Sequence, residues 1–242
     1  MSETTDQITE AQLAATIDHA ILKPEFTRDD VDAQLTIARD WKVFSVCVRP
    51  SDIAHAVQFL AGSGVAVGTV IGFPHGTTST AAKVAETRQA AADGATEFDM
   101  VVNIGALRSG FDDVVRDDIR AVVEAAGGAV TKVILEVSLL DDEQIERGSR
   151  LAEEAGADFV KTSTGFAGGG ATVETVSLMR RTVGPDTQVK ASGGVRSLQD
   201  ALMMLEAGAT RLGTSGSATI LGELRQIAAG GTASGAVDES SY

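Results

Sequence analysis

Short apolar, β-branched segments recur along the whole chain, and most are followed by an alanine-rich amphipathic stretch. We expect strands at Ala15–His19, Val43–Arg49, Val65–Gly72, Thr96–Asn103, Thr131–Val137, Asp158–Thr162, Thr187–Ala191 and Thr210–Gly213. Their centres are separated by roughly twenty to thirty-five residues, which is enough for one crossover helix after each strand. This alternation continues without a break in composition, so it predicts a single α/β domain.

Helical patterns fill the intervals, and the clearest are Ser79–Asp93, Phe111–Ala126, Asp142–Ala155 and Thr172–Thr182. A glycine just before the next strand is typical of a helix end, as at Gly94, Gly156 and Gly208. Eight strands in 242 residues predict a (β/α)8 TIM barrel, which takes about 250 residues. An open doubly wound sheet is disfavoured because no G-x-G-x-x-G turn follows a strand. We expect the barrel domain to occupy residues 1–227 and a flexible, Gly- and Ser-rich tail to occupy 228–242.

The formal net charge of −14 argues against nucleic acid or an anionic membrane as a partner. Low lysine and high aspartate content favour adaptation to high salt, as in halophilic archaea, over an ordinary acidic surface. No apolar run approaches the roughly 18 residues of a membrane span, and the N-terminus lacks a secretory pattern. Cys47 is the only cysteine, so no intrachain disulfide can form. The default expectation is a cytoplasmic protein.

Lys161 and Lys190 lie in glycine-rich surroundings at the ends of two expected strands. Only six of the twenty basic residues are lysines, so these two are not placed there for solubility. A lysine on a buried strand is costly unless paired, and a second cation nearby favours loss of its proton. A neutral lysine amine is the nucleophile that Schiff-base chemistry requires. The pair predicts an enzyme that binds a carbonyl covalently, but it does not show which lysine is the nucleophile.

Asp99 lies in the apolar run Glu97–Asn103, where an unpaired carboxylate is not tolerated. Barrel enzymes place active residues at the C-terminal ends of strands, so Lys161 and Lys190 can share one cavity and one of them is the expected partner of Asp99. In such a cluster one amine attacks the carbonyl while the other amine and the carboxylate transfer protons. The alternative is a buried structural ion network without catalysis.

Two glycine-rich turns, Ser192–Arg196 and Leu212–Ser217, follow the last two expected strands. Phosphate sites of this fold lie in these loops, where free backbone N–H groups at a helix start bind anions. Ser197 is the expected N-cap of the first following helix, with Asp200 at the capping-box position. The turns predict phosphate binding, although a Gly-Gly pair can also serve only a tight turn. Substrate and phosphate contacts are expected from Thr162, Gly193, Gly194, Arg196, Gly213 and Ser215.

Motifs that match a known family run through the chain from about Gln12 to Gly222. They are Thr16–His19, Leu22–Pro24, Ser45–Val48, Val70–Pro74, Phe98–Gly105, Val160–Phe166 and Val189–Arg196. With these motifs the chain resembles the deoxyribose-phosphate aldolases, which are class I, Schiff-base enzymes. The resemblance implies a Schiff base on Lys161, with Asp99 and Lys190 as proton donor and acceptor.

The same resemblance implies reversible cleavage of 2-deoxy-D-ribose 5-phosphate to acetaldehyde and D-glyceraldehyde 3-phosphate, without metal or cofactor, in deoxyribose phosphate catabolism. It leads us to expect these small molecules as partners and a homo-oligomer, dimeric or tetrameric. An aldolase for another phosphorylated sugar and a catalytically silent phosphosugar-binding barrel are the alternatives. The presence of both lysines and Asp99 counts against the silent barrel.

The sequence departs from the family pattern after the eighth strand, where many relatives have two successive serines. Here Gly216 separates Ser215 from Ser217, which puts one hydroxyl contact to phosphate in question. Tyr242 is similar to a C-terminal tyrosine that reaches the site in some relatives.

Two further residues are candidates for lining the site. Cys47 is interpreted as a small buried residue without a catalytic role, and the resemblance places it near the site. Asp18 is expected either to face the cavity or to be buried against a backbone partner. His19, His55 and His75 lack metal-ligand spacing, which disfavours a metal-dependent aldolase.

Overall fold

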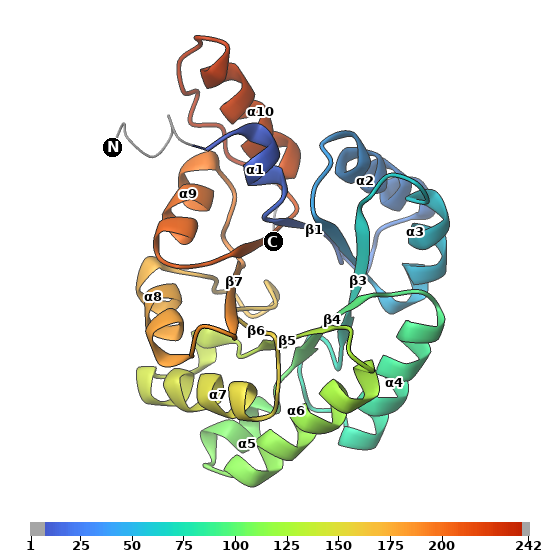
Figure 1. Ribbon diagram of the computed structural model, residues 1–242, viewed down its shortest axis with the longest axis vertical. Helices are drawn as coiled ribbons and strands as arrows, with labels where there is room; N and C mark the ends of the chain where they lie inside the picture. The colour runs from blue at the N-terminus through green and yellow to red at the C-terminus, as the bar shows by residue number, and fades with distance from the viewer. Residues whose placement is uncertain (1–7, 239–242) are drawn as a thin grey trace.

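The computed structural model describes residues 8–238, and the eight strands of this part close into a parallel barrel surrounded by helices (Figure 1). The strands are β1 Ile17–Ile21, β2 Ser45–Val48, β3 Ala66–Ile71, β4 Glu97–Val101, β5 Val130–Ile134, β6 Phe159–Lys161, β7 Gln188–Ser192 and β8 Arg211–Thr214. Each strand pairs with the next along the chain, and β8 closes the barrel by pairing Gly213 with Asp18 of β1. The predicted (β/α)8 architecture is confirmed.

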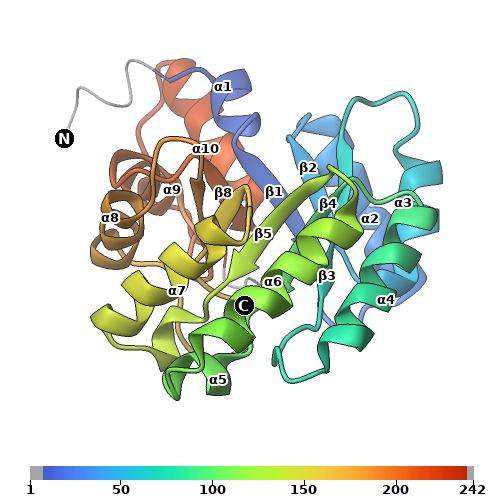
Figure 2. The same cartoon turned by 60° about the horizontal axis from the view of Figure 1, so that its bottom comes forward.

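The helices cover the outside of the barrel and lie roughly side by side around it (Figure 2). They are α1 Glu10–Ala14, α2 Arg28–Asp40, α3 Ile53–Phe59, α4 Thr80–Ala92, α5 Ile104–Arg108, α6 Asp112–Ala126, α7 Asp142–Glu154, α8 Val173–Thr182, α9 Leu198–Glu206 and α10 Ser217–Ala228. Short 3-10 turns, Pro50–Asp52 and Val137–Leu139, follow β2 and β5. The predicted capping box of Ser197 and Asp200 is present at the start of α9. None of the helices in the described part of the chain is long and apolar enough to cross a membrane.

The first strand begins two residues later than expected. Residues Glu10–Ala14 form a short helix that was not expected from the sequence, and Ala15 is its C-cap. The Thr9 side chain accepts from the backbone N–H of Gln12, whose own side chain accepts from Thr9, and this capping box stabilises the turn. The strand therefore spans Ile17–Ile21 instead of Ala15–His19.

Side chains alternate along the strands between an outer face toward the helices and a face toward the barrel interior. In β4, Phe98 and Met100 join the aliphatic core between barrel and helices, where burying each such side chain stabilises the fold by about 1.5–3 kcal/mol. Glu97 and Asp99, on the other face, are buried inside the barrel. Branched apolar residues usually fill a barrel interior. Charged side chains occupy much of it here, and this is where the candidate site lies.

Candidate functional site

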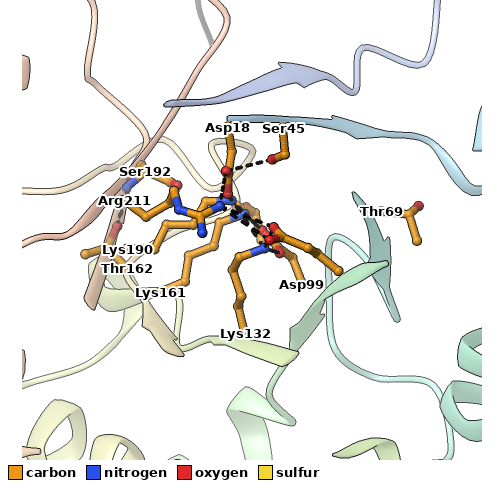
Figure 3. Close-up of polar contacts among 12 residues, drawn as sticks. Asp18, Ser45, Thr69, Asp99, Lys132, Lys161, Thr162, Lys190, Ser192 and Arg211 are labelled. Atoms are coloured by element: carbon orange, nitrogen blue, oxygen red, sulfur yellow. Dashed lines mark hydrogen bonds and ion pairs between the residues drawn. The ribbon is translucent and has the colours of Figure 1, made fainter. Parts of the chain in front are cut away.

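Seven ionisable side chains inside the barrel contact one another, and their head groups converge near the barrel axis (Figure 3). All of them are buried, with exposed fractions of 8% or less. We refer to this set as the charge cluster: Asp18 of β1, Glu97 and Asp99 of β4, Lys132 of β5, Lys161 of β6, Lys190 of β7 and Arg211 of β8.

Asp99 is the centre of the charge cluster. Its Oδ2 accepts from the amines of both Lys161 and Lys190, at 2.8 Å each. Its Oδ1 accepts from Lys132 Nζ, also at 2.8 Å. The register between β6 and β7 sets Lys161 beside Lys190, so their side chains reach one carboxylate from neighbouring strands. The expected sharing of a cavity by the two lysines and Asp99 is thus present in the structure.

Asp18 holds the other side of Lys190. Its Oδ2 accepts from Lys190 Nζ, and its Oδ1 accepts from Ser45 Oγ and Arg211 Nη1, both at 2.7 Å. Lys190 therefore contacts two carboxylates, whereas Lys161 contacts only that of Asp99 among the described residues.

This difference separates the proton affinities of the two lysines. Burial, which outweighs the attraction of Asp99, and the nearby Lys190 charge lower the pKa of Lys161 from its ordinary value of 10.5. Lys190 is just as buried, but Asp18 and Asp99 together outweigh that burial and raise its pKa. Lys161 is consequently the amine that loses its proton more easily, and Lys190 keeps its charge.

A pocket opens above the charge cluster at the C-terminal ends of the strands. The predicted site residues that line it are Asp18, Cys47, Lys161, Lys190, Gly193, Gly194, Gly213 and Ser215. Ser192 lines it as well, and its buried hydroxyl has no hydrogen-bond partner among the described residues. A Cβ at position 213 would meet the Ser192 hydroxyl at 2.1 Å, so glycine at this position of β8 leaves room for the Ser192 side chain of the paired strand β7.

Thr162 has a different place from the one expected. Its hydroxyl donates to the backbone carbonyl of Ser192 at 2.8 Å and accepts from the Ser192 N–H at 2.9 Å. The side chain thereby joins the ends of β6 and β7, and it is not among the residues lining the pocket. Thr162 shapes the wall of the site by holding Ser192 in position.

Arg196 also lies outside the pocket lining. Its backbone N–H donates to the Asp200 carboxylate at 3.1 Å, and its carbonyl accepts from the backbone N–H of Asp238 at 3.0 Å. A phosphate contact was expected from the Arg196 guanidinium, but Arg196 does not line this pocket.

The two serines of the turn before α10 have different surroundings. Ser217 Oγ lies 2.8 Å from His19 Nδ1, and His19 Nε2 lies 2.9 Å from Gln34 Oε1. Burial lowers the pKa of His19 to about 4, so the ring is neutral and its Nε2–H donates to Gln34. Its Nδ1 then accepts from Ser217, whose hydroxyl is directed away from the pocket. Ser215 is the serine of this turn that lines it.

Gly216 faces the segment that follows α10. A side chain at this position would place its Cβ 2.9 Å from the Asp238 Cβ and 3.1 Å from Asp238 Oδ2. Asp238 also lines a neighbouring pocket with Lys23, Ser215 and Gly216, at the start of α10. The residue that departs from the family pattern is thus the one that lets a carboxylate approach this helix N-terminus. Tyr242 lies outside the described residues.

The wall opposite the glycine turns is apolar. Ala20, Leu22 and Cys47 line the pocket and pack with Val70 and Phe73 in a small cluster separate from the main core. Burial, and then the nearby Asp99 charge, raise the pKa of Cys47 to about 11, so the thiol is neutral. This wall offers a carbon chain an apolar contact beside the Lys161 amine.

Three members of the charge cluster were not expected from the sequence: Glu97, Lys132 and Arg211. The signal that singled out Asp99 could have found them, because each is a charged residue within a predicted strand. Alternation also places Glu97 on the same face as Asp99. Together these side chains give the pocket a nucleophilic amine with a lowered pKa, a second amine with a raised pKa, carboxylates for proton transfer and a glycine-rich end.

Comparisons with known proteins agree with this chemistry. The sequence model of the DeoC/LacD family aldolases matches residues 10–231. Deoxyribose-phosphate aldolase 2 of Staphylococcus aureus is 55% identical over 208 residues, which cover 86% of this chain and 94% of that protein. Deoxyribose-phosphate aldolase of Macrococcus caseolyticus is 54% identical over 209 residues, covering 86% and 95%. The tetrameric structure of deoxyribose phosphate aldolase from Aeropyrum pernix is similar with a TM-score of 0.85 at 33% identity, covering 93% of this chain and 96% of that one.

Proposed function

The chain belongs to the DeoC/LacD family of aldolases, and on that premise we propose that it cleaves 2-deoxy-D-ribose 5-phosphate reversibly to acetaldehyde and D-glyceraldehyde 3-phosphate. The observation that carries this proposal is the buried Lys161 amine, which has a lowered pKa and a single carboxylate contact among the described residues. A class I aldolase needs such an amine, because only the neutral form attacks the C1 carbonyl of the sugar.

In the cleavage direction, Lys161 Nζ adds to C1, and loss of water from the carbinolamine gives an iminium ion. A base then removes the proton of the C3 hydroxyl, the C2–C3 bond breaks, and its electron pair forms an enamine as glyceraldehyde 3-phosphate leaves. Protonation of the enamine at C2 and hydrolysis release acetaldehyde and restore the lysine. Asp99 and Lys190 transfer these protons. The Asp99 Oδ2 atom accepts hydrogen bonds from both Lys161 and Lys190, which places the two groups beside the reacting amine.

The phosphate group binds at the glycine-rich end of the pocket. Gly193, Gly194 and Gly213 expose backbone there, and Ser215 adds a hydroxyl that has no hydrogen-bond partner among the described residues. The N-cap residue of α10 is Gly216, which has no side chain of its own to cap the helix, so backbone N–H groups at this N-terminus can receive an anion. The apolar wall at Leu22 and Cys47 takes the two-carbon end of the sugar beside Lys161.

Three features of this proposal stay predictions. We expect a homo-oligomer, dimeric or tetrameric, and the Aeropyrum pernix relative is a tetramer. A cytoplasmic location and an adaptation to high salt are expected from composition and charge.

Borohydride reduction in the presence of acetaldehyde tests the proposed chemistry. The reduced adduct adds two carbons irreversibly to the lysine that formed the Schiff base, and peptide mapping identifies this lysine. We expect the modification on Lys161. No adduct, or an adduct only on an exposed lysine such as Lys42, would contradict the proposal.

Replacing Gly216 with serine should tighten phosphate binding by roughly tenfold, which is the effect of one added hydrogen bond to a charged group. The backbone at Gly216 has φ −86°, so serine is tolerated there, but its side chain displaces Asp238 and brings a hydroxyl to the α10 N-terminus. The measurement is the inhibition constant of inorganic phosphate against sugar cleavage. Asp238→Asn is the matched control, which removes the charge and keeps the shape. Unchanged inhibition in both variants would show that neither residue acts at the phosphate site.

A further inference from the structure

The charge cluster contains unequal numbers of positive and negative side chains. Its four cationic side chains face three carboxylates, and all seven are buried. Burying an uncompensated charge is costly, so the cluster is most stable when one cationic side chain gives up its proton. The identity of that side chain follows from the contacts.

Arg211 cannot be the neutral member, because a guanidinium does not lose its proton in proteins. Lys132 contacts Glu97 at 2.6 Å and Asp99 at 2.8 Å, and Lys190 contacts Asp18 and Asp99. Lys161, with one carboxylate, is the member that loses its proton at least cost.

The other interior side chains of the strands add no charge to this count. The buried Glu136, which follows β5, accepts from Thr164 of the pocket wall and contacts no member of the charge cluster among the described residues. From β2, Ser45 donates to Asp18 and Cys47 is a neutral thiol. From β3, the interior positions are Gly68 and Val70, which pair with Glu97 and Asp99 in the register and carry no charge, whereas Thr69 pairs with the outward-facing Phe98 and stands apart from the contacts of the cluster (Figure 3). Among side chains in mutual ionic contact, the charge balance is therefore set by the seven residues of the charge cluster.

Arg211 and Glu97 belong to the cluster but do not line the pocket. They are the first residues of β8 and β4, at the end of the barrel opposite to the pocket. The Arg211 guanidinium stacks on Phe44 at 3.6 Å from the ring centre and contacts Asp18 at 2.7 Å and Glu97 at 3.4 Å. Neither side chain is placed to touch a substrate bound to Lys161.

We propose that Arg211 and Glu97 are positioning residues that set the proton affinity of Lys161 from the far end of the barrel through the net charge of the cluster. Arg211 supplies the surplus positive charge that keeps Lys161 unprotonated, and Glu97 limits that surplus. This inference rests on the proposed function, in which the neutral Lys161 amine attacks the sugar.

Three variants test the proposal by changing the charge count. Arg211→Met leaves three cations for three carboxylates, so Lys161 should hold its proton up to a pH about one unit higher. Glu97→Gln leaves four cations for two carboxylates, so the pH midpoint of Lys161 deprotonation should move in the opposite direction, to lower pH. The double variant restores the wild-type surplus of one cation, and its midpoint should return to that of the wild type.

Each variant leaves the remaining carboxylates paired, which favours retention of the fold. Without Arg211, Asp18 still contacts Lys190 and Ser45, and Glu97 still contacts Lys132. Arg211→Lys, which keeps the charge, should leave the midpoint unchanged. Thermal unfolding of all variants reports any loss of stability separately from the change in proton affinity.

The proton affinity of Lys161 can be measured without the sugar. Formaldehyde and cyanoborohydride methylate neutral amines, so the rate at Lys161, obtained by peptide mapping and normalised to exposed Lys42, reports the neutral fraction at each pH. The pH profile of sugar cleavage should move by the same amount and in the same direction. Absence of sugar cleavage in the wild type would reject the proposed function, while the methylation midpoints would still test the charge balance.

Two results would overturn the inference. One is an Arg211→Met protein whose Lys161 midpoint equals that of the wild type. The other is a double variant that keeps the full shift of Arg211→Met, because the effect would then come from the missing arginine itself and not from the net charge.

Discussion

A Lys161→Met variant is expected to lose sugar cleavage by roughly 10⁴-fold or more, as enzymes do when the covalent nucleophile is removed. Methionine fills a similar volume without an amine, so no Schiff base can form. Asp99 keeps its contacts with Lys132 and Lys190, which leaves the remaining cluster with three cations and three carboxylates. The fold should therefore survive. Steady-state cleavage of deoxyribose 5-phosphate checks the rate, and circular dichroism checks the fold.

Lys42→Met is the matched control for this substitution, because Lys42 is exposed and does not belong to the charge cluster. It should leave the rate within twofold or so of the wild type, as expected for a surface substitution. Cleavage at a wild-type rate by Lys161→Met would exclude Lys161 as the covalent residue.

Replacing Lys190 with leucine is expected to abolish turnover, with a loss of about 10²–10⁴-fold from proton transfer alone. The same substitution removes the positive charge nearest to Lys161 and leaves Asp18 and Asp99 with one cation fewer. Lys161 should then hold its proton more tightly, because a neighbouring cation no longer opposes it. The variant thus has two defects with different pH dependence.

Raising the pH separates the two defects. A higher pH removes the proton from Lys161. Borohydride trapping of acetaldehyde on the Lys161 amine should therefore recover in the Lys190→Leu protein. Turnover should stay low, since the Lys190 amine that is assigned to proton transfer is absent. If turnover recovers with trapping, Lys190 acts only through its charge, and its assigned part in proton transfer is wrong.

The fold was predictable because it depends on periodic signals that are local in sequence. Apolar runs such as those around Val46 and Met100 form strands, and amphipathic segments such as Asp142–Glu154 form helices of the barrel. Element ends were less predictable. The strand expected from Ala15 begins at Ile17, because the Thr9 capping box starts a helix whose last turn reaches Ala14.

The site residues that could be predicted from the sequence are those whose charge is unfavourable in a buried strand. Lys161, Lys190 and Asp99 stand out as charged residues in apolar strands, and the structure brings all three together. Thr162 and Arg196 could not be placed in this way. The direction of the Thr162 hydroxyl depends on the backbone of Ser192, which is thirty residues distant in sequence.

The sequence by itself determined the barrel, the buried lysines and the glycine turns. The alternation of strand and helix patterns, a charged residue inside an apolar segment and a glycine-rich turn can each be recognised from residues that are neighbours in the sequence. Only the tertiary structure decided which lysine loses its proton more easily. That choice depends on the number of carboxylates each amine contacts across the barrel, and these come from strands far apart in the chain. The approach of Asp238 to Gly216 was likewise decided by the folded chain, because no local pattern relates the two residues.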